Sequence, residues 1–141
     1  MRYLFISDIK PLCPLLDFDI DKINIDLHND FNCFKIKNKE GICEFHFIRI
    51  TDNRLYNEQN AVIIFANIVE SNLELILGNN EEVIIRNNEI DDIGILTNFA
   101  KGELTQSNKY YFETNIKYFF IDVFNGKLID IFCKEAIIIL W

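Results

Sequence analysis

The chain has 141 residues, 50% of them hydrophobic and 13% aromatic, so it is long and apolar enough to bury a core as one domain spanning 1–141, and it is not of the disordered class. Its net charge of −8 argues against nucleic acid as a partner, because phosphates would be repelled. No apolar run approaches the ~18 residues of a membrane-spanning helix, and no signal-peptide pattern opens the chain, so we expect a cytoplasmic protein without a membrane partner.

The negative charge is concentrated in one part of the chain. Residues 101–141 carry five basic and five acidic side chains, whereas residues 1–100 carry nine basic and 17 acidic ones. This asymmetry is compatible with a cationic protein partner. It is equally compatible with a simpler role, which is to keep a Phe- and Ile-rich protein soluble.

The first predicted elements are strands. Tyr3–Ser7 is expected to form one, and a loop with two prolines follows. Residues 15–28 then alternate apolar with acidic or polar side chains, which point to opposite faces of a strand. A phase change near Asp21-Lys22 predicts a bulge or a break. The alternation predicts a ridge of carboxylates facing water, formed by Asp17, Asp19 and Asp21, with Asp26 further along.

Two hairpins are predicted in the middle of the chain. The first joins Asn32–Lys37 to Ile42–Thr51 through a turn at residues 38–41, and a loop follows. The second joins Leu73–Leu77 to Val83–Arg86. Between them, Ala61–Val69 is apolar on every side; its β-branched residues favour a buried strand over a helix.

A helix is predicted over Glu89–Lys101. Asn88 can serve as its N-cap, and apolar residues recur at helical spacing behind an acidic first turn. Gly102 stands where a helix C-terminus favours glycine.

The C-terminal third is predicted to be strands, with a two-residue Asn125-Gly126 turn that would place Phe120 opposite Ile131. Many strands, hairpin turns and one or two helices define the class as α+β, a single domain of mainly antiparallel sheet. The strands expected here are Tyr110–Glu113, Ile116–Phe124, Lys127–Cys133 and Ile137–Trp141.

Sequence patterns for chemistry are weak, and we expect no catalytic residues, no metal and no cofactor. Asp17-x-Asp19-x-Asp21 resembles the start of a calcium loop, but Lys22 and His28 stand where that loop needs Gly and Glu. His28 shares a strand face with Asp26 and Asp30, which leaves an enzyme as the third-ranked reading. No phosphate-binding glycine loop occurs. Four cysteines lack metal-ligand spacing and are expected to be reduced: Cys13, Cys33, Cys43 and Cys133.

A second acidic region follows the middle of the chain. Glu81 and Glu82 are expected at a hairpin tip, and Asp91 and Asp92 in the first turn of the predicted helix. If the fold brings this region to the first ridge, one large negative surface results. The predicted partner-binding residues are therefore Asp17, Asp19, Asp21, Asp26, Glu81, Glu82, Asp91 and Asp92.

Residues 118–132, Tyr-Phe-Phe-Ile-Asp-Val-Phe-Asn-Gly-Lys-Leu-Ile-Asp-Ile-Phe, resemble the closing hairpin of several bacterial toxin-immunity proteins, including those of contact-dependent growth inhibition. The resemblance implies a cytoplasmic protein that binds a cognate toxin domain, often a cationic nuclease, and blocks it. The alternative is a small-ligand-binding or scaffold domain without catalysis, which a deep apolar cavity would favour.

Overall fold

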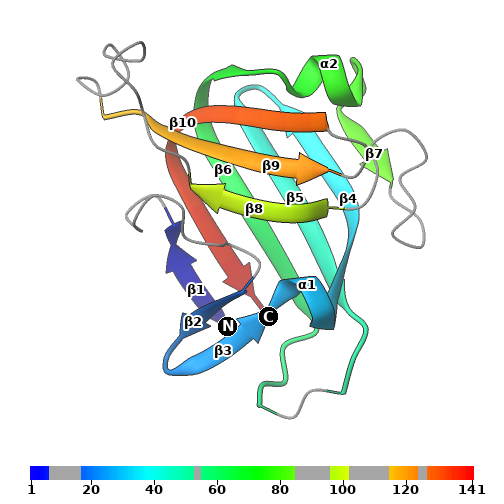
Figure 1. Cartoon of the computed structure of the whole chain (residues 1–141), viewed down its shortest axis with the longest axis vertical. Coiled ribbons are helices and arrows are strands. Elements are labelled where there is room, and N and C mark those ends of the chain that lie inside the picture. The colour runs from blue at the N-terminus through cyan, green and yellow to red at the C-terminus, as the bar shows by residue number, and fades with distance from the viewer. Residues whose placement is uncertain (7–16, 53–54, 85–95, 102–114, 124–126) are drawn as a thin grey trace.

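Strands dominate the computed structural model, which describes residues 1–6, 17–52, 55–84, 96–101, 115–123 and 127–141 (Figure 1). The helices among these residues are short, with four residues in α1 and five in α2. Along the chain the elements are β1 (Arg2–Phe5), β2 (Asp17–Ile20), β3 (Ile23–Asp26), α1 (Leu27–Asp30), β4 (Phe31–Lys39), β5 (Ile42–Arg49), β6 (Asn60–Ser71), α2 (Leu73–Leu77), β7 (Glu82–Ile84), β8 (Leu96–Lys101), β9 (Lys117–Val123) and β10 (Lys127–Leu140).

The strands form one large antiparallel sheet in the order β7-β4-β5-β6-β10-β9-β8, and β1 also pairs with β10. Strands β2 and β3 form a separate hairpin. The predicted class is confirmed: the protein is a single small α+β domain built mainly of antiparallel sheet. None of the helices in the described segments has the length and hydrophobicity needed to cross a bilayer.

Strand β10 joins the two layers of the molecule. One of its edges pairs with β6 over residues 131–140, and the other pairs first with β9 and then with β1. Its buried positions change phase between Cys133 and Ala136, and Lys134 and Glu135 between them are both exposed. At this break in the alternation the strand bends, so that β8, β9 and the start of β10 cross in front of β4, β5 and β6 (Figure 1).

Aromatic rings fill the space between the layers. The ring of Phe65 on β6 lies 6.1 Å from that of Phe45 on β5 and 5.2 Å from that of Phe119 on β9, measured between centroids. All three side chains are fully buried. The pairing of rings from opposite layers makes a single core that depends on the bend in β10.

The predicted hairpin before the centre of the sheet is confirmed as β4 and β5. Its two turn residues, Glu40 and Gly41, both have positive φ angles, of 52° and 77°. Such a turn twists in the same sense as the strands that it connects, and glycine adopts it without strain. The strand interpretation of residues 61–69 is also confirmed, because β6 lies between β5 and β10 with Ala61, Ile63 and Phe65 fully buried.

The predicted second hairpin is wrong. Residues 73–77 form α2, and β7 pairs with β4 instead. Leu73 and Leu77 are buried while Leu75 is 89% exposed, which is the burial pattern of one helical turn rather than of a strand with one core face. Gly78, with a φ of 72°, ends the helix.

The predicted helix over 89–101 is wrong where the structure describes it. Residues 96–101 form β8, which pairs with β9 as the last strand of the sheet. Tertiary pairing therefore overrides a local helical pattern that contained a glycine and two polar residues of low helix propensity. Residues 89–95 lie outside the described part of the chain, as does the predicted strand Tyr110–Glu113.

The last hairpin exists, but its register differs by one residue from the prediction. Lys127 pairs with Val123, so Ile131 lies opposite Phe119 rather than Phe120. A one-residue slip in register would turn one strand's core side chains outward. In the observed register Ile131 and Phe119 are both fully buried, so core packing favours this register over the predicted one. The predicted strands over 127–133 and 137–141 are one continuous strand, β10.

The cysteines in the described residues are free and buried, as their predicted reduced state requires; Cys13 lies outside. Burial raises the pKa of the Cys33 thiol and that of the Cys133 thiol to about 12. Burial also raises the pKa of Cys43, with smaller contributions from the charges of Cys33 and Glu44. The thiols are therefore protonated and act as small apolar core groups.

Replacing Phe65 by Ala is expected to lower the free energy of unfolding by about 3–5 kcal/mol, because the substitution would leave a cavity between the two layers. The measurement is urea denaturation followed by circular dichroism. Leu75→Ala on the exposed face of α2 is the control, with an expected change within about 0.5 kcal/mol. Equal effects of the two substitutions would contradict the assignment of Phe65 to the core.

Candidate partner-binding surface

The acidic segment folds into the β2–β3 hairpin. Asp21 and Lys22 form its two-residue turn with φ angles of 53° and 66°. The break predicted near these residues is thus a tight hairpin turn, and the alternation restarts in the opposite phase on β3. Asp21 belongs to the turn and not to a strand face, so the ridge of carboxylates does not continue through it.

One face of this hairpin is acidic. Asp17 lies opposite Asp26 and Asp19 lies opposite Asn24 in the antiparallel ladder, and directly opposite residues share a face. The other face carries Phe18, Ile20, Ile23 and Ile25, which belong to the core or pack against it. The apolar face therefore anchors the hairpin and turns Asp19 and Asp26 away from the core, and the backbone of Asp17 lies opposite that of Asp26.

Local hydrogen bonds hold two of these carboxylates. The Asp19 Oδ1 atom accepts a hydrogen bond of 3.1 Å from the side-chain amide of Asn24. Asp26 is the N-cap of α1, and its carboxylate accepts hydrogen bonds from the backbone N–H of Asn29 at 2.9 Å and from its side-chain amide at 2.7 Å. Asp26 therefore has a structural role in addition to its charge.

The turn carboxylate is tied to the first strand. The Asp21 Oδ2 atom lies 3.5 Å from Arg2 Nη1, and the Asp21 side chain is 72% exposed. The Arg2 Nε atom donates a hydrogen bond of 2.7 Å to Glu58. Burial raises the pKa of Glu58, but hydrogen bonds from its own backbone N–H and from Arg2 lower it on balance. Arg2 thus neutralises part of the negative charge around the turn. No sequence pattern predicted its contacts with Asp21 and Glu58.

The second acidic region is separate. Glu81 precedes β7 and lies 3.6 Å from Lys39, while Glu82 lies opposite Lys37 in the β4–β7 ladder. Both glutamates line an open groove of about 400 Å³ with charged neighbours on β4 and β5. Strand β7 is at one edge of the large sheet, and the β2–β3 hairpin lies beside β1 at the other side of the molecule (Figure 1).

The two predicted acidic regions are therefore not brought together. Asp17, Asp19, Asp21 and Asp26 form one group, which we call the acidic hairpin. Glu81 and Glu82 form another, compensated by lysines. Asp91 and Asp92 lie outside the described residues. The groove beside Glu81 is open and is lined by Lys and Glu side chains with Ile42 as its one apolar residue, so it is not the deep apolar cavity that a small-ligand domain would favour.

The strand face proposed for Asp26, His28 and Asp30 does not form. Residues 27–30 make the helical turn α1. Asp30 is buried and accepts hydrogen bonds from the Tyr56 hydroxyl at 2.5 Å and from the Thr51 hydroxyl at 2.8 Å. Asp30 is thus used to hold the connection between β5 and β6. Within the described segments, no group of three or more His, Cys, Asp or Glu side chains could hold a metal ion.

Arg49 completes this anchoring. Its guanidinium donates hydrogen bonds to the backbone carbonyls of Thr51, Tyr56 and Glu58, and lies 4.6 Å from the centre of the Tyr56 ring. Sequence reasoning missed this cluster, because Tyr56 and Glu58 come from a segment recognisable only as a polar loop. A half-buried guanidinium that donates to several backbone carbonyls is expected to fix one loop geometry.

The Asp26 cap can be tested by itself. Asp26→Ala is expected to lower the free energy of unfolding by about 1 kcal/mol, because the first turn of α1 loses its side-chain acceptor. Asp26→Asn removes the same charge but keeps a capping oxygen, so its effect should be close to zero. Chemical denaturation measures both; an equal loss in the two variants would show that charge, and not capping, matters at this position.

The Tyr56–Asp30 contact predicts a pH dependence. Burial, and next its hydrogen bond to Asp30, raise the pKa of Tyr56 above its ordinary value of 10.0. A pKa that is raised in the folded state contributes stability that is complete below the unfolded-state pKa and is lost as the pH rises from that value towards the folded-state pKa. Tyr56→Phe should lower the free energy of unfolding by about 1–3 kcal/mol at neutral pH, and the gap to wild type should narrow above about pH 10. Urea midpoints across this range measure the gap, and a gap independent of pH would contradict the assignment.

Comparison of the chain with protein-family models, with curated proteins and with solved structures finds no match.

Proposed function

We propose that this chain is an immunity protein, one that binds and neutralises a cognate cationic toxin domain in the bacterial cytoplasm through the acidic hairpin. The observation that carries the proposal is the placement of Asp19 and Asp26 on one face of a hairpin whose other face is anchored in the core, with Asp17 opposite Asp26 in the ladder. The role is binding without catalysis, cofactor or membrane. It agrees with the resemblance of residues 118–132 to immunity proteins.

The carboxylates of the acidic hairpin would attract a positively charged partner. A nuclease must carry a positive cleft for the phosphates of its substrate. Carboxylates on a rigid hairpin can occupy such a cleft in place of phosphates, and complementary potentials speed the encounter of the two proteins. The excess of acidic residues in 1–100 adds a long-range attraction of the same sign.

The pairing within the hairpin supports a functional reason for the charges. Asp17 and Asp26 lie directly opposite each other, and like charges at such positions destabilise a sheet. Solubility alone could be met by carboxylates placed apart. A surface that concentrates charge at a cost to stability fits a binding site better than a neutral support role.

The test is the rate of association with a cationic toxin domain, and the candidate to use is any toxin C-terminal domain found to be encoded directly upstream of this chain's gene. Replacing Asp17, Asp19 and Asp21 together by Asn should slow association on the order of tenfold at low salt and weaken its salt dependence. Asn is well tolerated in the turn at position 21, because it adopts positive φ readily. Surface-based kinetic binding at several salt concentrations provides the measurement.

The matched control removes the same number of charges elsewhere. Glu40→Gln, Glu74→Gln and Glu135→Gln together change exposed carboxylates away from the hairpin. The proposal requires a smaller effect from this control than from the hairpin variant. Equal effects would reduce the role of the hairpin to net charge, and unchanged binding in the hairpin variant would remove it from the interface.

A further inference from the structure

The β2–β3 hairpin is held to the rest of the molecule by its side chains. In the described part of the chain, β2 and β3 pair with each other and form a sheet of their own, apart from the large sheet. Strand pairing among these residues therefore does not set the angle of the hairpin. Its apolar face places it on the core, and polar contacts at its two ends act on its orientation.

The first polar contact is at the turn. The Arg2 Nε atom donates a hydrogen bond of 2.7 Å to Glu58 Oε1, and Nη1 of the same guanidinium lies 3.5 Å from Asp21 Oδ2. The Arg2 and Glu58 side chains are only 24% and 14% exposed. The second carboxylate oxygen of Glu58 accepts a hydrogen bond of 3.0 Å from the backbone N–H of Asn57. Because both of its oxygens have a donor, the Glu58 carboxylate holds the guanidinium in one position beneath the turn.

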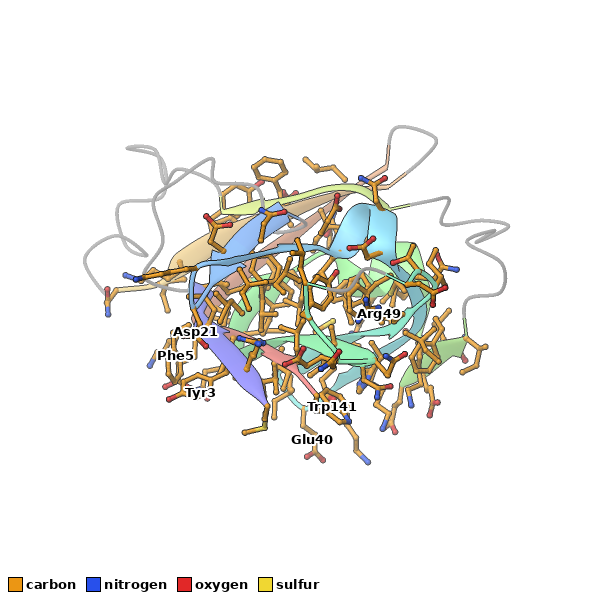
Figure 2. All side chains as sticks on the ribbon, turned by 90° about the horizontal axis from the view of Figure 1, so that it is seen from below. Tyr3, Phe5, Asp21, Glu40, Arg49 and Trp141 are labelled. Carbon is orange, nitrogen blue, oxygen red and sulfur yellow. The ribbon has the colours of Figure 1, made fainter. Side chains whose placement is uncertain are left out.

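The second polar contact is at the other end, where β3 leads into α1. Asp30 ends α1 and accepts the hydrogen bond of the Tyr56 hydroxyl. Tyr56 and Glu58 belong to one short stretch, whose carbonyls at both residues accept hydrogen bonds from Arg49. Figure 2 shows Asp21 and Arg49 well apart. The same stretch therefore holds the hairpin at two separate points, and loss of the contact at the turn would leave the hairpin attached at α1.

We infer that Glu58, acting through Arg2, is a positioning residue for the acidic hairpin: it fixes the orientation in which the carboxylates meet a partner. The inference deepens the proposed function, and its binding part rests on that function. Charge attracts a cationic partner at long range whether or not the hairpin is held at one angle. Close contact is tighter when the groups are already in place, because less conformational entropy is then lost on binding. Glu58 therefore acts mainly on the dissociation rate.

The first experiment needs no partner. Residual dipolar couplings of the backbone N–H groups, measured on the full chain, give an order parameter for each strand relative to the large sheet. In wild type all strands should have values near about 0.85, as rigid backbone does. In Glu58→Gln the values for β2 and β3 should fall towards about 0.6, whereas those for β4 and β5 should stay near about 0.85. Glu74→Gln, which removes an exposed carboxylate on α2, is the charge-matched control and should change neither set.

The second experiment measures both rate constants with the toxin domain used in the association test. Glu58→Gln should raise the dissociation rate roughly fivefold and change the association rate less than about twofold. Arg2→Lys keeps the net charge but replaces a planar fork with one ammonium group, so it should raise the dissociation rate by a similar factor. In an Asp21→Asn background, Glu58→Gln should have a smaller effect, because both substitutions break the same connection.

Circular dichroism verifies that each variant is folded, and Arg2→Lys replaces Glu58→Gln in the first experiment if the latter is not. Unchanged order parameters in β2 and β3 overturn the inference, as does an equal fall in both pairs of strands. Slower association with an unchanged dissociation rate would reduce Glu58 to its charge and also overturn it. A wild-type protein that does not bind the toxin domain contradicts the proposed function instead, and the order parameters then decide whether Glu58 positions the hairpin.

Discussion

The hydrogen bonding of β10 on both of its edges is the constraint on which the rest of the structure depends. This strand belongs to both layers, and its bend after Cys133 sets how the β8–β9 layer crosses the β4–β6 layer. The rings of Phe65 and Phe119 fill the resulting space from opposite sides. Packing and topology are therefore coupled, because a register change in β10 would move core side chains of both layers at once.

The acidic hairpin has a different physical basis. Its position comes from apolar residues such as Ile20 and Ile25, whereas its proposed function comes from the carboxylates on the other face. The same segment also contributes Asp26 as the cap of α1 and Asp21 as a partner of Arg2. Carboxylates proposed for binding and carboxylates with a structural role thus lie in one short stretch of chain. At Asp26, only a substitution that keeps the capping oxygen can remove the charge without removing the cap.

The sequence predicted well where one local rule decided the outcome. The alternation of apolar and acidic residues identified the acidic segment as strand, and the turn residues at 40 and 41 located the β4–β5 hairpin. It failed where partners distant in sequence decided. Residues 96–101 satisfy a helical pattern but pair with β9, and the β9–β10 register follows from the burial of Phe119 opposite Ile131. The candidate site was predicted as one surface, but the sheet separates Glu81 and Glu82 from the hairpin, which no local pattern can reveal.

The pairing of Arg2 with Leu140 joins opposite ends of the chain. Closing so long a loop has a large entropic cost, which must be met before the contact adds any stability. Contacts of this kind slow folding, since they form only after the strands between them are in place. The first strand is therefore expected to dock last, and until it does, the edge of β10 from Ile137 to Leu140 stays uncovered on the nascent protein.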